Sequence, residues 1–74
     1  MNQREQILDY LQRFETITPM QAYSDLGITK LATRISEMRR WDGVEFNIEM
    51  IKSKNRFGRP VRYAKYSLKE DVNQ

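Results

Sequence analysis

The chain has 74 residues, enough for one domain, and its 13 Lys and Arg against 10 Asp and Glu give a net charge of +3. Cysteine and histidine are both absent, which excludes disulfides and thiolate or imidazole metal sites and removes the side chain best suited to proton transfer near neutral pH. No apolar run reaches membrane-spanning length and no signal peptide is recognisable, so we expect a soluble protein in the reducing cytoplasm.

The charge is unevenly distributed along the sequence. Residues 1–27 sum to −2, and residues 70–74 also sum to −2. Residues 28–69 hold eleven Lys and Arg against four acids, a sum of +7. Such polarisation is typical of a surface that binds a polyanion.

The first predicted helix covers residues 3–14. Asn2 with Glu5 three residues later fits a capping box, in which each side chain accepts a hydrogen bond from the other's backbone. Apolar residues then recur at helical spacing from Ile7 to Phe14, which indicates one core-facing side.

A second, shorter helix is predicted over residues 19–25, after an extended link at 16–18. Thr18 is a hydroxyl cap, Pro19 suits the first helical position, and Gly27 can adopt the positive φ that ends a helix. The apolar surface expected for this helix consists of Met20, Ala22, Tyr23 and Leu26.

A third helix is predicted over residues 29–41, with Thr29 as its cap. Leu31, Ile35 and Met38 recur on one side and can face a core, while cations and hydroxyls gather on the other. A short turn between two helices, the second with a polar outer side, is the arrangement of a helix-turn-helix, whose second helix enters the major groove of DNA.

The remaining chain predicts a β-hairpin. Apolar residues alternate from Val44 to Lys52, a loop rich in Asn, Gly and Pro covers residues 52–60, and a second β-rich run covers 61–68. One buried strand face is expected to hold Val44, Phe46, Ile48 and Met50, and cross-strand pairing is expected for Glu45 and Glu49 with Arg62 or Lys65.

Aromatic side chains allow two interpretations. A platform that stacks on single-stranded bases is one, but strand and helix spacing favours packing in the core and on the hairpin. The residues concerned are Tyr10, Tyr23, Trp41, Phe46, Tyr63 and Tyr66. For Phe57 in the loop, we favour a plug that folds back on the domain over a wedge against the sugars of DNA.

Three helices followed by a hairpin predict an α+β winged helix-turn-helix fold over residues 1–69, with residues 70–74 as a polar, disordered tail. Two phrases, LATRISEMRR and KNRFGRPVRYAKYSL, resemble those of a small winged helix-turn-helix family common in bacteriophages and prophages. The resemblance covers roughly residues 5–68 and includes the Ile17-Thr18-Pro19 helix start and the turn at residues 26–28. It implies DNA binding, usually regulatory. One departure is Asp42, where relatives tend to have a basic residue before the glycine.

The expected DNA contacts fall into three groups. Candidates for reading bases are Lys30, Thr33, Arg34 and Glu37, with Ser36 less favoured. Arg34 ranks first among them, since arginine to guanine is the commonest pairing. Candidates for phosphate contacts are Thr29, Arg39, Arg40, Lys52, Lys54 and Arg62, and those for the minor groove at the wing tip are Asn55, Arg56 and Arg59.

The predicted function is therefore binding of double-stranded DNA by a phage or mobile-element transcription regulator in a bacterial host cell. An excisionase-like accessory that bends DNA during recombination is the first alternative. A protein-interaction module and a binder of structured RNA are two others. Tight binding by so small a domain favours a homodimer or repeated sites. No enzymatic residue set, metal site or cofactor motif is predicted.

Overall fold

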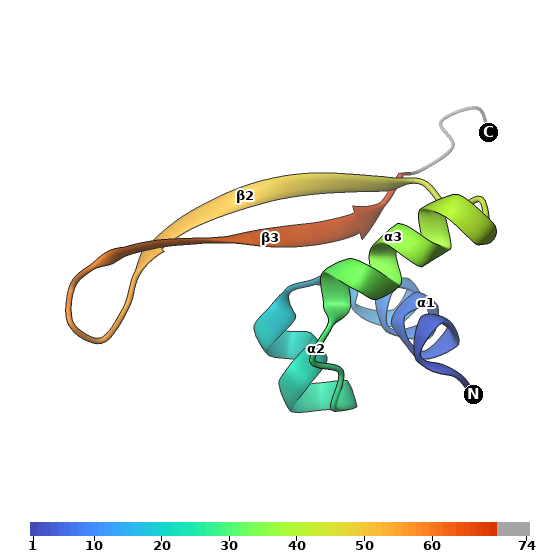
Figure 1. Ribbon diagram of the computed structural model, residues 1–74, viewed down its shortest axis with the longest axis horizontal. Helices are drawn as coiled ribbons and strands as arrows, with labels where there is room; N and C mark the ends of the chain where they lie inside the picture. Colours follow the sequence, from blue (N-terminus) through green and yellow to red (C-terminus); the bar gives the residue numbers. More distant parts are fainter. Residues whose placement is uncertain (70–74) are drawn as a thin grey trace.

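A computed structural model describes residues 1–69, which form three helices and a three-stranded antiparallel sheet of order β1-β3-β2. In chain order the elements are α1 (Gln3–Phe14), β1 (Thr16–Ile17), α2 (Pro19–Leu26), α3 (Leu31–Trp41), β2 (Phe46–Lys54) and β3 (Pro60–Leu68). The helices cluster at one end, and the β2–β3 hairpin projects past them (Figure 1). The predicted order of elements is confirmed, and the predicted tail at 70–74 lies outside the described residues.

The first two helices begin at the predicted caps. Asn2 Oδ1 accepts from the Glu5 N–H, and Glu5 Oε1 accepts from the Asn2 N–H, a complete capping box. Thr18 and Gln21 form a second capping box at the start of α2. Gly27 ends α2 with φ +70°, a conformation that glycine adopts without steric cost.

The start of α3 differs from the prediction. The helix begins at Leu31, two residues later than predicted, and Lys30 occupies the cap position without a side-chain hydrogen bond. Thr29 as the cap was therefore wrong, because it lies one residue too far from the first helical turn. Lys30 therefore provides no side-chain cap for the first N–H groups of α3.

The core lies between the three helices and the end of the sheet that covers them. It consists of Ile7, Tyr10, Leu11, Ile17, Ala22, Ile28, Leu31, Ile35, Met38 and Tyr66. Four large side chains predicted to pack there are instead exposed, namely Phe14, Met20, Tyr23 and Trp41. Helices this short bury one narrow stripe each, so side chains at the margin of a stripe remain in solvent.

The loop is shorter than predicted, because β2 lies two residues further along the chain than predicted and β3 begins one residue earlier. β2 and β3 pair continuously from Phe46 opposite Leu68 to Lys54 opposite Pro60, so the loop shrinks to residues 55–59. The predicted link at 16–18 is partly β1, which pairs with Tyr66 and Ser67 of β3. Because opposite residues share a face, Ile17, Ile48 and Tyr66 lie on the same side of the sheet.

Only the base of that face is covered by the helices. Phe46 packs against the core, with its ring edge-on to Tyr66. Ile48 and Met50 point the same way but are 48% and 56% exposed, and Tyr63 on the opposite face is also exposed. The prediction of one buried face running from Val44 to Met50 was wrong, since the strands extend beyond the helices that cover their base (Figure 1).

A hydrogen bond between α1 and the end of α2 predicts a pH effect. The Tyr10 hydroxyl donates to Asp25 Oδ2 at 2.6 Å. This bond, followed by burial and the charge of Asp25, raises the pKa of Tyr10 above its ordinary value of 10.0. The resulting stabilisation is fully present below the unfolded-state pKa and is lost as pH rises through the higher folded-state pKa.

We expect Tyr10→Phe to remove this alkaline loss. Denaturant unfolding of wild type and variant at pH 8 and pH 10.5 measures the difference. Tyr23→Phe is the matched control, because the Tyr23 side chain is 63% exposed. An equal loss of stability for wild type and Tyr10→Phe over this interval would contradict the assignment.

Candidate nucleic-acid interface

The outer side of α3 presents a row of polar and basic side chains. The exposed residues of this helix and its approach are Thr29, Lys30, Ala32, Thr33, Ser36, Arg39, Arg40 and Trp41. Thr33, Ser36 and Arg40 are spaced three and four apart, so they lie along one line on the helix. Ser36, less favoured from the sequence, lies in the middle of this line.

Two of the predicted base-reading residues are engaged inside the protein. Arg34 Nη1 lies 3.4 Å from Glu37 Oε1, and the two side chains are only 28% and 19% exposed. Arg34 Nε and Glu37 Oε1 are buried and have no hydrogen-bond partner within residues 1–69. In this arrangement Arg34 is less available to a base than Lys30 and Thr33.

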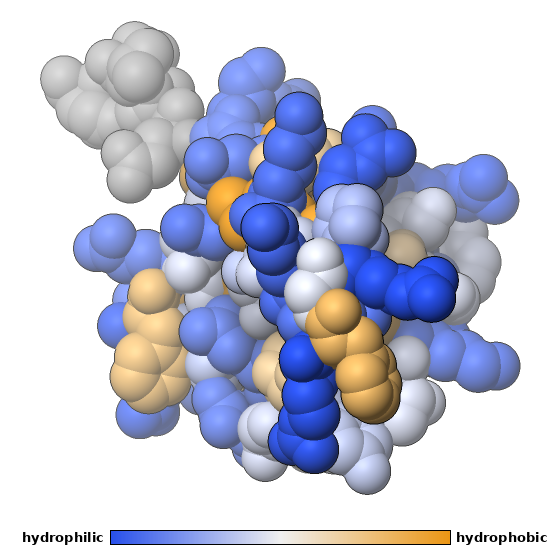
Figure 2. All heavy atoms as spheres, turned by 90° about the vertical axis from the view of Figure 1, so that its left-hand side faces the viewer, coloured by the Kyte–Doolittle hydropathy of each residue, from blue (hydrophilic) through white to orange (hydrophobic). Residues whose placement is uncertain are grey.

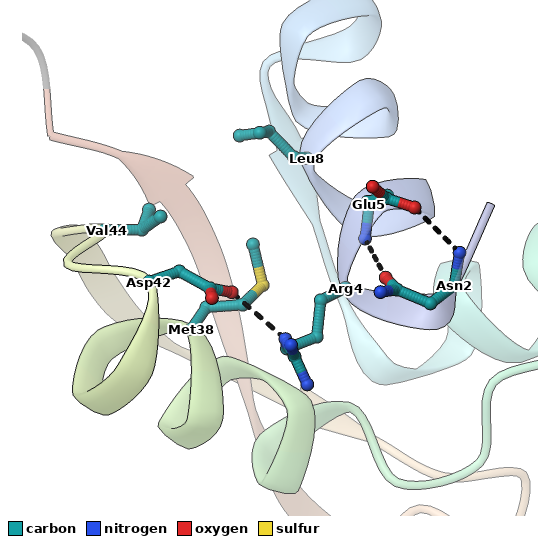
Figure 3. Close-up of a pocket in the computed structure, with 7 residues that line it drawn as sticks. All are labelled: Asn2, Arg4, Glu5, Leu8, Met38, Asp42 and Val44. Atoms are coloured by element: carbon teal, nitrogen blue, oxygen red, sulfur yellow. Dashed lines mark hydrogen bonds and ion pairs between the residues drawn. The ribbon is translucent and has the colours of Figure 1, made fainter.

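Arg4 of α1 joins this group from the far end of the sequence. Its guanidinium lies 3.6 Å from Glu37 Oε1 and 3.0 Å from Asp42 Oδ2, and its Cζ is 5.5 Å from the centre of the Trp41 ring. Figure 3 shows Arg4 reaching across the groove beside Met38 to Asp42. Arg4 thus ties α1 to both the middle and the end of α3.

No local pattern pointed to Arg4, because its partner Asp42 is 38 positions away. The pairing also accounts for Asp42, which the resemblance marked as a departure. Its carboxylate holds Arg4, so this corner of the domain carries a structural ion pair instead of a basic side chain.

The wing, residues 52–62, carries the densest positive charge. Lys52, Lys54, Arg56, Arg59 and Arg62 are all exposed, and none forms an ion pair within residues 1–69. Lys52 lies directly opposite Arg62 in the hairpin. Like charges placed so closely are destabilising, so this pair suits a surface that is neutralised by a polyanion.

Most of the strand cations share one face. Lys52, Lys54 and Arg62 lie on the same side as Tyr66, the side that packs on the helices at its base. On the other face, Glu49 lies opposite Lys65, as predicted. Glu45 instead pairs with Lys69, at 3.8 Å, which is a correction to the predicted partner.

The tip of the wing is a closed turn. Asn55 Oδ1 accepts from the N–H groups of Phe57 and Arg59, at 2.9 and 3.0 Å, and the Gly58 N–H donates to the Asn55 carbonyl. Gly58 takes φ +79°. Asn55 therefore shapes the turn, which leaves Arg56 and Phe57 at its apex.

Phe57 does not fold back on the domain. Its side chain is 83% exposed, so the prediction of a plug was wrong. The helices end well short of the wing tip, so they do not cover the ring (Figure 1). The exposed position of the ring is compatible with the alternative, a wedge against the sugars of DNA.

Other kinds of site find no counterpart in the described part of the chain. Within residues 1–69, no group of three or more acidic residues is arranged to hold a metal ion. No helix there is long and apolar enough to cross a membrane. The structured surface offers the α3 face and the wing.

Comparison with known proteins identifies the family of this architecture. Residues 2–71 match the family described as winged helix-turn-helix domain. No curated protein and no solved structure gives a match. The match spans nearly the whole chain, including α3 and the wing, and a fold of this kind has duplex DNA as its usual partner. The chain therefore belongs to the winged helix-turn-helix domain family.

Proposed function

We propose that this protein binds double-stranded DNA, with α3 in the major groove and the wing on the adjoining backbone and minor groove. The observation that carries the proposal is the wing, where five exposed cations have no acidic partner within residues 1–69. They lie on the same small domain as a helix face of hydroxyls and cations. A duplex supplies the negative charge that both surfaces lack.

The two surfaces have different tasks in this proposal. Lys30, Thr33 and Ser36 read base edges, since their side chains are exposed on α3. Thr29, Arg39, Arg40 and the wing cations hold phosphates, which sets register and affinity but carries no sequence information. The uncapped start of α3 adds N–H groups that suit a phosphate oxygen.

Within this function we infer a regulator of transcription in a phage or mobile element, acting in the cytoplasm of a bacterial host. The alternative is an accessory of recombination that bends DNA, which is favoured by the long projecting wing. A homodimer or cooperative binding at repeated sites would supply the affinity that one small domain lacks.

The direct test is fluorescence anisotropy of a labelled random-sequence duplex at several salt concentrations. We expect binding in the submicromolar to micromolar range that weakens steeply with salt, because phosphate contacts release counterions. An RNA hairpin of equal length serves as competitor. No binding at low salt, or stronger competition by RNA than by unlabelled duplex, would overturn the proposal.

Glu37 provides a second prediction on the same surface. Glu37→Gln removes the negative charge that holds Arg34 and Arg4 at 3.4 and 3.6 Å. We expect it to raise affinity for random duplex DNA by about 3- to 10-fold, since it adds one net positive charge and releases Arg34 toward the groove. Anisotropy at matched salt measures this.

The control for Glu37→Gln is Glu45→Gln, which removes an acid whose side chain is exposed and which, among residues 1–69, forms an ion pair only with Lys69. Equal gains in affinity for the two variants would mean that net charge alone determines the effect on DNA binding. A loss of affinity for Glu37→Gln would instead favour direct reading of a base by Glu37, as the sequence predicted.

A further inference from the structure

The apex of the wing combines one large apolar ring with flanking arginines. Phe57 is the most exposed large hydrophobic residue of the described chain, at 83%, and Arg56 and Arg59 lie beside it. Exposing such a ring to water is unfavourable. Its position at the far end of the hairpin indicates a role toward a ligand.

The turn fixes the backbone that carries the ring. Asn55 Oδ1 binds the backbone of Phe57 itself as well as that of Arg59, and both strands remain paired up to Lys54 and Pro60. The apex lies roughly 13 Å beyond Met50, because the four paired residues from Ile51 to Lys54 each add about 3.3 Å. An exposed ring on a fixed backbone, at the end of a paired hairpin, is suited to insertion between flat groups.

The surroundings of Phe57 favour DNA over other partners. Viewed from the tip of the wing, hydrophilic side chains cover most of the surface, and hydrophobic ones form small, separate groups (Figure 2). Docking of a protein uses a larger continuous apolar patch. A single ring between arginines matches the minor groove, where arginine is attracted by negative potential and an apolar wedge can enter a base step.

We propose that Phe57 inserts between adjacent base pairs in the minor groove and kinks the duplex, while Arg56 and Arg59 hold the flanking phosphates. This inference rests on the proposed DNA binding and adds a second activity to it, a bend in the bound DNA. Wedges of this kind bend DNA by about 20–90°. The bend would direct the duplex around the domain and bring more backbone within reach of the basic wing.

The test is ligase-mediated circularisation of random-sequence fragments of about 100 bp, which are shorter than the persistence length of about 150 bp and close poorly without a bend. We expect wild type to increase circle formation at least 10-fold. At protein concentrations that saturate each variant by anisotropy, Phe57→Ala should lose this increase, and Phe57→Leu, which keeps an apolar wedge, should retain it.

The outcomes separate the two proposals. If wild type fails to bind duplex DNA, the proposed function fails and the wedge fails with it. If wild type binds without promoting circles, or if Phe57→Ala promotes them as well as wild type, DNA binding stands and the wedge is overturned. Thermal unfolding of Phe57→Ala checks the fold, which we expect to be unaffected because the ring has few contacts.

Discussion

Replacing Arg56 and Arg59 together with alanine is expected to weaken binding of random duplex DNA by about 30-fold at 0.15 M salt. Through counterion release, each phosphate contact multiplies the binding constant by roughly the molar salt concentration to the power −0.9. At this concentration the factor is about 5- to 6-fold. Both arginines are exposed at the wing tip and form no ion pair within residues 1–69, so no ion pair in this part of the chain is lost with them.

The same model predicts the salt dependence. The slope of log affinity against log salt should become shallower by about 1.8 in the double variant, since two contacts of about 0.9 each are removed. Anisotropy titrations from 50 to 300 mM salt measure the slope, and they distinguish lost phosphate contacts from a partly unfolded preparation.

A matched control keeps the total charge change the same. Arg13→Ala with Lys69→Ala also removes two exposed cations, one on α1 and one past the end of β3 opposite the wing tip. We expect this variant to lose less than about 3-fold in affinity. Equal losses in the two double variants would mean that net charge alone attracts DNA, and that the wing makes no particular contact.

Local signals in the sequence predicted the helices well. Capping residues and apolar spacing gave α1 its observed bounds and placed the start of α2 at Pro19. These signals succeed because caps and helical periodicity act over three or four residues. The start of α3 was missed, since Thr29 has the chemistry of a cap but Lys30 occupies the cap position.

Properties that depend on distant packing were not predictable. Strand alternation correctly assigned Phe46, Ile48 and Met50 to one face, but it carries no information on where the covering helices end. Arg34 has helical spacing suited to an outer face, yet it pairs with Glu37, which also pairs with Arg4 from α1. Contacts between α1 and α3 are set by the crossing of the helices, which no local pattern encodes.

The wing shows the same division. Its charge, its glycine turn and its arginines were legible from residue types alone. The role of Asn55 and the exposure of Phe57 were not, because they depend on how far the hairpin extends beyond the core. Phe57 was expected to be buried as a plug, and its observed exposure is the feature on which the proposed wedge depends.

The largest effect on stability is expected at Ile17. This side chain is fully buried, and its two-residue strand β1 attaches the sheet to the helices beside Tyr66. Ile17→Ala should cost about 2–5 kcal/mol, the transfer of the lost methyl groups plus a cavity. A domain of 74 residues has roughly 4–11 kcal/mol of stability in total, so this one change removes a large fraction.

Ile48→Ala is the matched control for this prediction. Ile17 and Ile48 lie on either side of Tyr66 on the same face of the sheet, yet Ile48 is 48% exposed and Ile17 is 0% exposed. We expect Ile48→Ala to cost about 1 kcal/mol or less, and Ile17→Ala to lower the melting temperature by about 10 °C or more. Thermal and urea unfolding measure both. Similar losses for the two variants would show that the wing face is covered in solution, by a second copy of the chain or another partner, and a dependence of the Ile48→Ala effect on protein concentration would identify self-association as the cause.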